Sequence, residues 1–374
     1  MKTLISKSSY RLRELDFLRG IAIILVLFRH SKINDFLVNM GWIGVDLFFV
    51  LSGFLVSSLL FKEYRLTGAL DAKRFLIRRG FKIYPLYYIT FVIYFVFSEK
   101  HAFSHLLADL IFMQNYFSGW GYLYSASWTL AVEEHFYFAL VCLILFLGIK
   151  TSWLKIKRNN KKQIDYFVIF VCCVLVVCLI LRIYSNIYLP SQDAKNFTMT
   201  HLRIDSLMSG VLIAYLLIYK KKSFSVFFVT HKCKLIIIAI LCSIWTPFID
   251  PLPSLFVKTI GFSLVYITFS ILLIFFLLNP LINIRLSVLF GDFFVNAISK
   301  IGFCSYSIYI IHTLVIRGVN YTFNEMNYIL DPYFNFIFVF IISVLLGFFM
   351  TYKIERWFLD KRNQYFPSKS IKAN

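Results

Sequence analysis

The chain has 374 residues, of which 59% are hydrophobic and 16% are charged, and its formal net charge at pH 7 is +20. Because soluble domains average about 25% charged residues, this composition excludes an ordinary soluble domain and indicates a polytopic membrane protein. The basic excess does not require a nucleic-acid partner, since cytoplasmic loops of membrane proteins are rich in Lys and Arg and bind anionic membrane lipids.

Ten apolar runs are predicted to cross the membrane as helices, because a hydrocarbon core of about 30 Å needs about 20 helical residues. In chain order the runs are 15–30, 41–61, 81–97, 131–149, 165–181, 203–219, 235–249, 255–278, 301–321 and 333–352. The predicted fold is therefore all-α, a bundle of about ten transmembrane helices. A further apolar segment, 101–117, is short and carries His105, Asp109 and Gln114, so we expect it to stay on the outer face.

The distribution of positive charge predicts the orientation. If residues 101–117 stay outside and the N-terminus is cytoplasmic, the inner segments hold 30 Lys and Arg residues and the outer loops hold 3. By the positive-inside rule, both termini are then cytoplasmic. The first span is followed by no small-residue cleavage site and is expected to remain as an anchor. We expect one transmembrane domain over 1–374 with its core at 15–352, a short basic tail at 353–374 and no appended soluble domain.

The first span, LDFLRGIAIILVLFRH, contains polar side chains that are costly in a bilayer. Arg19 and His30 are eleven residues apart, about three helical turns, so they share one helix face about 16 Å apart. Asp16 lies one turn before Arg19. The neutral imidazole of His30 can take a proton from a hydroxyl group, which suits a general base. The alternative is an interfacial histidine satisfied by lipid or water, but the aligned arginine favours a stripe facing the bundle interior.

The next two spans contribute a carboxylate and a basic cluster. GWIGVDLFFVLSGF places Asp46 among glycines that permit close helix packing, and Asp46 needs a partner, either an arginine or His30. RRGFKIYP places Arg78, Arg79 and Lys82 at the cytoplasmic entry to a span. These cations either set the topology by binding lipid phosphates or clamp a phosphate-bearing ligand.

The motif SWTLAVEEHFYF opens another span. Trp128 lies at interface depth, where aromatic belts form. Glu133 and Glu134 point about 100° apart on a helix, so only one is expected to face the bundle with Tyr137. That glutamate can orient a histidine, as in a base and orienter pair, whereas the other is expected to be solvated.

The motif RIDSLMSG contributes Arg203 and Asp205 at another outer end. We expect them to pair with Glu133 or with each other, and a structural network and a substrate contact remain equally open. His312 lies inside a later span and is expected to be a buried, hydrogen-bonded histidine.

These five motifs, in this order, resemble the acyltransferase 3 family of integral membrane acyltransferases, from about Leu15 to about Tyr352. The resemblance implies a ten-span bundle in the cell membrane, the cytoplasmic membrane of a bacterium. Such a bundle moves acyl groups, most often acetyl, from a cytoplasmic donor such as acetyl-CoA to extracytoplasmic carbohydrate, and no metal is expected. Some members carry a fused esterase-like domain of the SGNH type, for which this sequence has no counterpart. Either a separate extracytoplasmic partner is needed or the membrane part acts alone.

On the donor side, the resemblance places Arg79 and Lys82 where the family usually has an Arg-x-x-Arg pair. We expect the phosphates of acyl-CoA to dock against Arg78, Arg79 and Lys82, with the thioester reaching into the bundle. Lys82 replaces the commoner second arginine, which removes a bidentate contact with phosphate.

On the acceptor side, the resemblance implies that His30 is the catalytic histidine, Arg19 its motif partner and Glu133 the motif glutamate. Held by Glu133 or Asp46, His30 either deprotonates the acceptor hydroxyl or carries the acyl group itself. His135 stands where glutamine is common and adds a titratable group near Glu133. Whether the acceptor is a polysaccharide or a glycolipid is left open by the sequence.

The alternative to an acyltransferase is a protein of another functional class, a membrane transporter of a small carboxylate or glycolipid. In a transporter, the buried charges would line the transport pathway. A transporter predicts two pseudo-symmetric halves with broken spans, and the sequence has no evident internal repeat. A purely structural membrane subunit would leave the five motifs unexplained.

Overall fold

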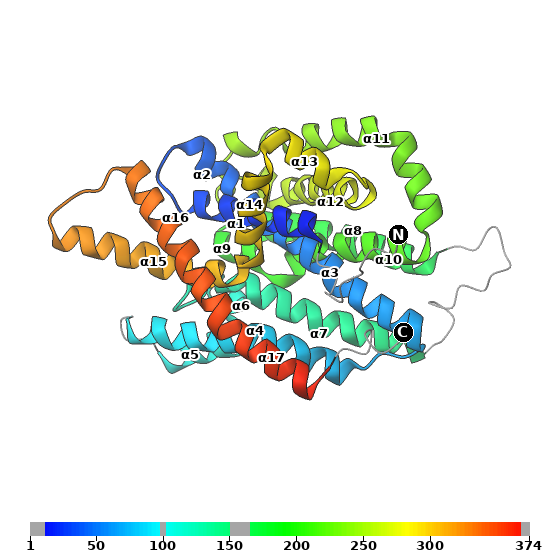
Figure 1. Cartoon of the computed structure of the whole chain (residues 1–374), viewed down its shortest axis with the longest axis horizontal. Coiled ribbons are helices and arrows are strands. Elements are labelled where there is room, and N and C mark those ends of the chain that lie inside the picture. The colour runs from blue at the N-terminus through cyan, green and yellow to red at the C-terminus, as the bar shows by residue number, and fades with distance from the viewer. Residues whose placement is uncertain (1–11, 98–101, 150–164, 368–374) are drawn as a thin grey trace, which may run out of the picture.

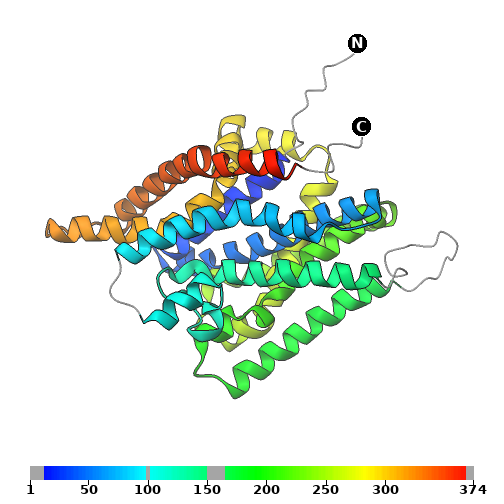
Figure 2. The same cartoon turned by 90° about the horizontal axis from the view of Figure 1, so that it is seen from below.

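The computed structural model describes residues 12–97, 102–149 and 165–367, and every regular element in these ranges is a helix (Figures 1 and 2). Ten of the described helices are sixteen residues or longer. They are α1 (Arg13–Arg29), α3 (Ile43–Thr67), α4 (Ala72–Val96), α7 (Trp128–Ile149), α8 (Tyr166–Tyr188), α10 (Ile204–Tyr219), α11 (Lys221–Ser243), α12 (Phe262–Leu278), α15 (Ser305–Glu325) and α16 (Pro332–Phe349). Each predicted span overlaps one of these helices, which confirms the all-α membrane bundle.

Shorter helices connect the long ones. The α-helices are α2 (Asp35–Gly41), α5 (Phe103–Leu110), α6 (Gln114–Phe117), α9 (Asp193–Thr198), α13 (Ile282–Phe290), α14 (Asp292–Phe303) and α17 (Arg356–Tyr365). The 3-10 helices are η1 (Ser125–Ser127), η2 (Thr200–Leu202) and η3 (Thr246–Phe248), and the π-helices are η4 (Val257–Gly261) and η5 (Met350–Glu355). In the described part of the chain, six helices are long and apolar enough to cross a membrane, or seven if the pair α13 and α14, bent by 116°, is one span. The total of ten spans and the cytoplasmic termini stay predictions.

Small residues bring the central helices close together. Helix α3 packs closely against α10 and α1. A Cβ atom added to Gly53 would lie 2.0 Å from the carbonyl oxygen of Leu207, and one added to Gly210 would lie 2.2 Å from that of Val50. Only glycine therefore fits at this α3–α10 crossing, as the packing interpretation of the glycines predicts.

The segment predicted to stay outside forms two short helices, α5 and α6. They are eight and four residues long, so neither can cross a bilayer. Phe112 between them has a positive φ of 61°. The buried carboxylate of Asp109 accepts the backbone N–H groups of Tyr122 and Leu123, at 3.1 and 2.9 Å. These hydrogen bonds to Asp109 hold α5 against the loop that precedes α7.

Helix α11 begins well before the predicted span 235–249. The basic run KKSFSVFFVTHKCK, which the charge pattern predicts to be a cytoplasmic loop, belongs to this helix from Lys221 onward. It contains no Gly or Pro that would end a helix. Two other predicted cytoplasmic segments, 1–13 and 150–162, lie almost entirely outside the described residues.

The orientation can be tested at two exposed lysines, Lys32 after α1 and Lys221 at the start of α11. In a background without the seven native cysteines, Lys221→Cys is expected to react with an impermeant maleimide only after the membrane is permeabilised. Lys32→Cys is expected to react in intact cells, because the positive-inside rule puts the two on opposite sides. Reaction of Lys221→Cys in intact cells would contradict the predicted orientation.

The predicted basic tail at 353–374 is a structured element over its described residues. The helix continues from α16 through η5 into α17, which packs against α4 (Figure 1). The rings of Phe81 and Phe366 lie 6.0 Å apart, and Arg78 donates a hydrogen bond from Nη1 to the carbonyl oxygen of Phe366. The expectation of a simple tail was incomplete because α17 is stabilised by a neighbour distant in the sequence.

Candidate active site

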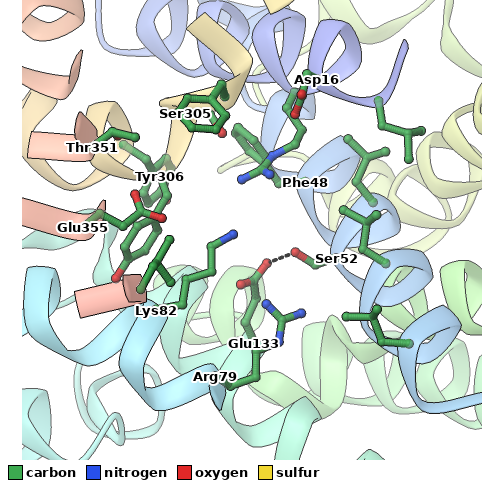
Figure 3. A pocket seen from close by; sticks show the side chains of 18 of the residues that line it. Asp16, Phe48, Ser52, Arg79, Lys82, Glu133, Ser305, Tyr306, Thr351 and Glu355 are labelled. Atoms are coloured by element: carbon green, nitrogen blue, oxygen red, sulfur yellow. Dashed lines mark hydrogen bonds between the residues drawn. The ribbon is translucent and has the colours of Figure 1, made fainter. Parts of the chain in front are cut away.

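A cavity of about 800 Å³, called here the basic cavity, lies between α1, α3, α4, α7 and the C-terminal segment η5–α17 (Figure 3). Among the described residues, cations outnumber acids in its lining. The cations are Arg19, Lys62, Arg79, Lys82, Arg356 and Arg362, and the acids are Asp16, Glu133, Glu355 and Asp360. This excess of positive charge favours an anionic ligand.

Glu133 is fixed in the wall of the basic cavity by hydrogen bonds to both of its oxygens. Ser52 donates to Oε1 at 2.5 Å (Figure 3), and Tyr137 donates to Oε2 at 2.8 Å. The guanidinium of Arg79 lies 4.7 Å from the centre of the Tyr137 ring, a cation–π contact. Glu133 therefore faces the bundle with Tyr137, one helical turn away, as the spacing predicts.

Glu134 does not follow the sequence-based expectation of a solvated side chain. It is 5% exposed, and its Oε2 accepts a hydrogen bond from Tyr84 at 2.9 Å. Both adjacent glutamates are inside the bundle because α7 is surrounded by protein at this level, with α3 beside Glu133 and α4 beside Glu134. His135, the third residue of the motif, contacts Thr200 through Nδ1 at 2.7 Å.

The predicted donor cluster is only partly brought together. Arg79 and Lys82 line the basic cavity, but Arg78 is absent from its lining and donates to the backbone of Phe366. The prediction that Arg78 contacts the donor is therefore not supported, since its guanidinium is used to hold the C-terminal segment. Two cations from α17, Arg356 and Arg362, join the cavity lining.

A second cavity, called here the aromatic cavity, has a volume of about 330 Å³ and lies at the opposite ends of α1 and α3. Its lining residues are Val26, Arg29, His30, Gly41, Trp42, Val45, Trp120, Ser125, Ala126, Trp128, Phe197, Leu252 and Tyr309. His30 follows directly after α1 and is exposed, whereas Trp128, predicted at interface depth, is 4% exposed. Arg29 forms an ion pair with Asp250 at 3.3 Å. The lining is mainly apolar and aromatic with a few polar groups, as in many small-molecule sites.

The two cavities share a wall. Val45 and Tyr309 line both of them. The Tyr309 hydroxyl donates to the carbonyl oxygen of Ala126 at 3.0 Å and accepts from Thr129 at 2.8 Å. Val45 and Tyr309 therefore separate the two cavities at this point, and hydrogen bonds hold the Tyr309 side chain in place.

Asp46, Arg203 and Asp205 form a buried network outside both cavities. Arg203 donates from Nη2 to both oxygens of Asp46 at 2.9 Å, and Asp205 pairs with Arg182 at 2.8 Å. All four side chains are fully buried. The guanidinium of Arg203 also lies 3.6 Å from the centre of the Phe262 ring.

This network corrects two predicted pairings. Arg203 pairs with neither Glu133 nor Asp205, because Asp46 of α3 faces it across the α3–α10 crossing. Asp46 was left open as a partner of an arginine or of His30, and the arginine is its partner. Arg182, which the sequence analysis did not select, completes the set. Its signal was an arginine directly at the end of the predicted span 165–181, where a charge within the bundle needs a partner.

Neither predicted holder of His30 is beside it. Glu133 lines the other cavity and Asp46 is bound to Arg203. The side chain beside His30 is His312, whose ring centre lies 5.0 Å from that of His30. Asp16 and Arg19 lie on α1, which ends just before His30, but they line the basic cavity. The polar residues of the first span are therefore divided between the two cavities.

The all-helical fold, with helices long and apolar enough to cross a membrane, defines an integral membrane protein, and two cavities with common lining residues lie inside its bundle. The acyltransferase domain family (Acyl_transf_3) matches residues 12–352, and the chain belongs to this acyltransferase 3 family. The resemblance seen in the five motifs is thus confirmed, and with it the class of enzyme, a membrane O-acyltransferase.

Several bacterial proteins are similar to this chain. The peptidoglycan O-acetyltransferase OatA of Listeria monocytogenes is 30% identical over 220 residues, which are 54% of this chain and 33% of that protein. A putative O-acetyltransferase of Staphylococcus aureus (strain COL) is 28% identical over 221 residues, 54% of this chain and 34% of that protein. The O-acetyltransferase OatA of Staphylococcus aureus (strain NCTC 8325) is 27% identical over 219 residues, with the same shares. The chain thus aligns with about a third of each of these relatives, and no solved structure matches it.

Proposed function

We propose that this protein transfers an acyl group, acetyl in the simplest case, from cytoplasmic acyl-CoA to a hydroxyl group of an extracytoplasmic or lipid-linked carbohydrate. The observation that carries the proposal is the shared wall of the two cavities, Val45 and Tyr309. A donor in one cavity and an acceptor in the other would meet at this wall. The name of the Listeria relative makes peptidoglycan a candidate acceptor.

The basic cavity is the proposed donor site. Its volume of about 800 Å³ suits a large ligand, and its cations suit the phosphates of coenzyme A. Arg79 can offer two parallel N–H donors to a phosphate, whereas Lys82 contributes a point charge. The positive-inside rule favours the cytoplasm for this end, because the end of α3 and the first turns of α4 together carry seven Lys and Arg residues there.

The aromatic cavity is the proposed acceptor site, with His30 as its catalytic residue. In one route His30 takes the proton from the acceptor hydroxyl, the oxygen forms a bond to the thioester carbonyl carbon, and the carbon–sulfur bond breaks to release coenzyme A as a thiolate. In the other route a nitrogen of His30 bonds to the thioester carbonyl carbon and the carbon–sulfur bond breaks to release the coenzyme A thiolate. The acceptor oxygen then takes the acyl group as the carbon–nitrogen bond breaks, and the hydroxyl proton passes to the freed imidazole. Both routes need the thioester to reach past Val45 and Tyr309.

The shared wall offers the experiment that tests the proposal. Purified protein is given labelled acetyl-CoA and peptidoglycan fragments, and the label in the glycan is measured. Val45→Trp is expected to lower transfer at least tenfold and to weaken acetyl-CoA binding much less, because added bulk at the wall blocks the thioester while Arg79 and Lys82 still hold the phosphates. Val92→Trp, at a position 58% exposed on α4, is the matched control and should keep full activity. Movement of an intact small molecule without formation of an acylated product would instead favour the transporter.

Donor binding depends on Arg79 in this proposal. Arg79→Ala is expected to weaken acyl-CoA binding and to make the remaining binding less sensitive to salt, because a charge-assisted contact with phosphate is lost. Lys82→Arg is expected to bind at least as well as the native protein. Calorimetric titration at two salt concentrations measures both effects. Unchanged affinity in a folded Arg79→Ala variant would leave this arginine as a topology determinant only.

A further inference from the structure

His312 was predicted to be a buried, hydrogen-bonded histidine, and this role accounts for only one of its two ring nitrogens. It is 0% exposed, and its Nδ1 lies 2.6 Å from the carbonyl oxygen of Tyr309. A carbonyl oxygen can only accept, so Nδ1 carries the hydrogen of this bond. In the neutral imidazole, Nε2 is then an acceptor with a free lone pair.

The second nitrogen of His312 is the unexplained atom. In the part of the chain that the structure describes, Nε2 is buried and has no hydrogen-bond partner. Native proteins rarely leave such an atom unsatisfied without a functional reason. The ring of His30 is tilted by 54° to that of His312, with 5.0 Å between their centres. At this separation, one nitrogen of each ring can share a hydrogen bond after a small rotation of the exposed His30 side chain.

We propose that His312 is a positioning residue for His30, a role that rests on the proposed transferase function. Nε2 of His312 accepts a hydrogen bond from one ring N–H of His30. That bond fixes the tautomer and the ring plane of His30 and leaves its other nitrogen unprotonated. The unprotonated nitrogen is the one directed at the acceptor hydroxyl in the aromatic cavity.

The surroundings of His30 favour this assignment over the two carboxylates that the sequence suggested. Glu133 accepts hydrogen bonds from Ser52 and Tyr137 in the other cavity, and Asp46 is bound to Arg203. An uncharged orienting group also avoids a buried anion beside the acceptor site, which would be costly to desolvate. The carbonyl oxygen that fixes His312 belongs to Tyr309, a residue of the shared wall. The side chain that orients His30 is therefore anchored at the wall that the thioester must reach.

Two substitutions separate positioning from packing. His312→Gln places an amide oxygen near the position of Nε2 and loses the donor to Tyr309. His312→Asn keeps a donor near the position of Nδ1 and loses the acceptor. If Nε2 orients His30, the glutamine variant should stay within about tenfold of the native kcat, and the asparagine variant should lose about 10- to 100-fold, the usual cost of losing an orienting group. The KM for acyl-CoA should be unchanged in both.

A second measurement tests whether His312 acts through His30. In a His30→Gln background, adding His312→Asn should cause no further loss of residual transfer, because no base remains to be positioned. An asparagine variant as active as the glutamine variant, additive losses in the double variant, or failure of both single variants to fold would each overturn the proposal. Absence of transfer by the native protein would instead reject the proposed function on which it rests, so the two failures are distinguishable.

Discussion

His30→Gln is expected to lower acyl transfer by about 10²- to 10⁴-fold, the range of general acid–base catalysis. Glutamine keeps a similar size and hydrogen-bonding capacity but cannot act as a base or carry the acyl group. Acyl-CoA binding should remain, since the basic cavity lies at the other ends of α1 and α3. The measurement is transfer of labelled acetyl to glycan, beside direct binding of acetyl-CoA.

The control for this substitution is His231→Gln. His231 lies on α11, where its ring contacts Phe227, and it lines neither cavity. This variant should be as active as the native protein. If His30→Gln also retained native activity in folded protein, His30 would be structural, and Glu133 or His135 would need to be tested as the base.

Asp46→Ala is expected to destabilise the protein by about 3–5 kcal/mol, because it leaves the buried guanidinium of Arg203 without its carboxylate. Both side chains are fully buried, so water cannot replace the lost partner. The free energy of unfolding in detergent, measured with a helix-sensitive probe, should show the loss.

The exposed ion pair of Arg29 and Asp250 provides the matched control. Asp250 is 49% exposed as a side chain, so Asp250→Ala should cost only about 0–1 kcal/mol. Removing both partners, in Asp46→Leu with Arg203→Met, should recover part of the stability lost in Asp46→Ala, because no uncompensated charge remains. Equal stability of Asp46→Ala and Asp250→Ala would contradict a structural role for the buried pair.

The sequence was sufficient to predict the helices and several inward-facing groups. Apolar length located all ten long helices, and the glycines of GWIGVDLFFVLSGF, Gly53 among them, anticipated a close crossing. Helical geometry, which is local, also predicted that one of the two adjacent glutamates faces the bundle with Tyr137. It did not identify Glu133 as that residue, and it did not predict that Glu134 would also be buried.

Partners on different helices could not be predicted from the sequence. The pairing of Arg203 with Asp46, and of Arg182 with Asp205, depends on which spans are neighbours, and hydropathy does not contain that information. The same reason hid Arg356 and Arg362, which the sequence places in a short basic tail, whereas the structure packs α17 against α4. His312 was missed as a functional candidate because a histidine among apolar residues has the same sequence pattern whether or not a second histidine faces it.

In the reaction proposed here, the shared wall at Val45 and Tyr309 also has to act as an electrical insulator. An enzyme with its donor on one side of a membrane and its acceptor on the other has two water-accessible paths, one from each side, that lead to the same point. If both stayed open at once, protons would leak down the membrane potential, at a cost to the cell with every catalytic cycle. The hydrogen bonds that Tyr309 makes with Ala126 and Thr129 hold the ring across this junction at rest. When the thioester passes between Val45 and Tyr309, the acyl-CoA itself therefore has to fill the opening and keep water and protons out.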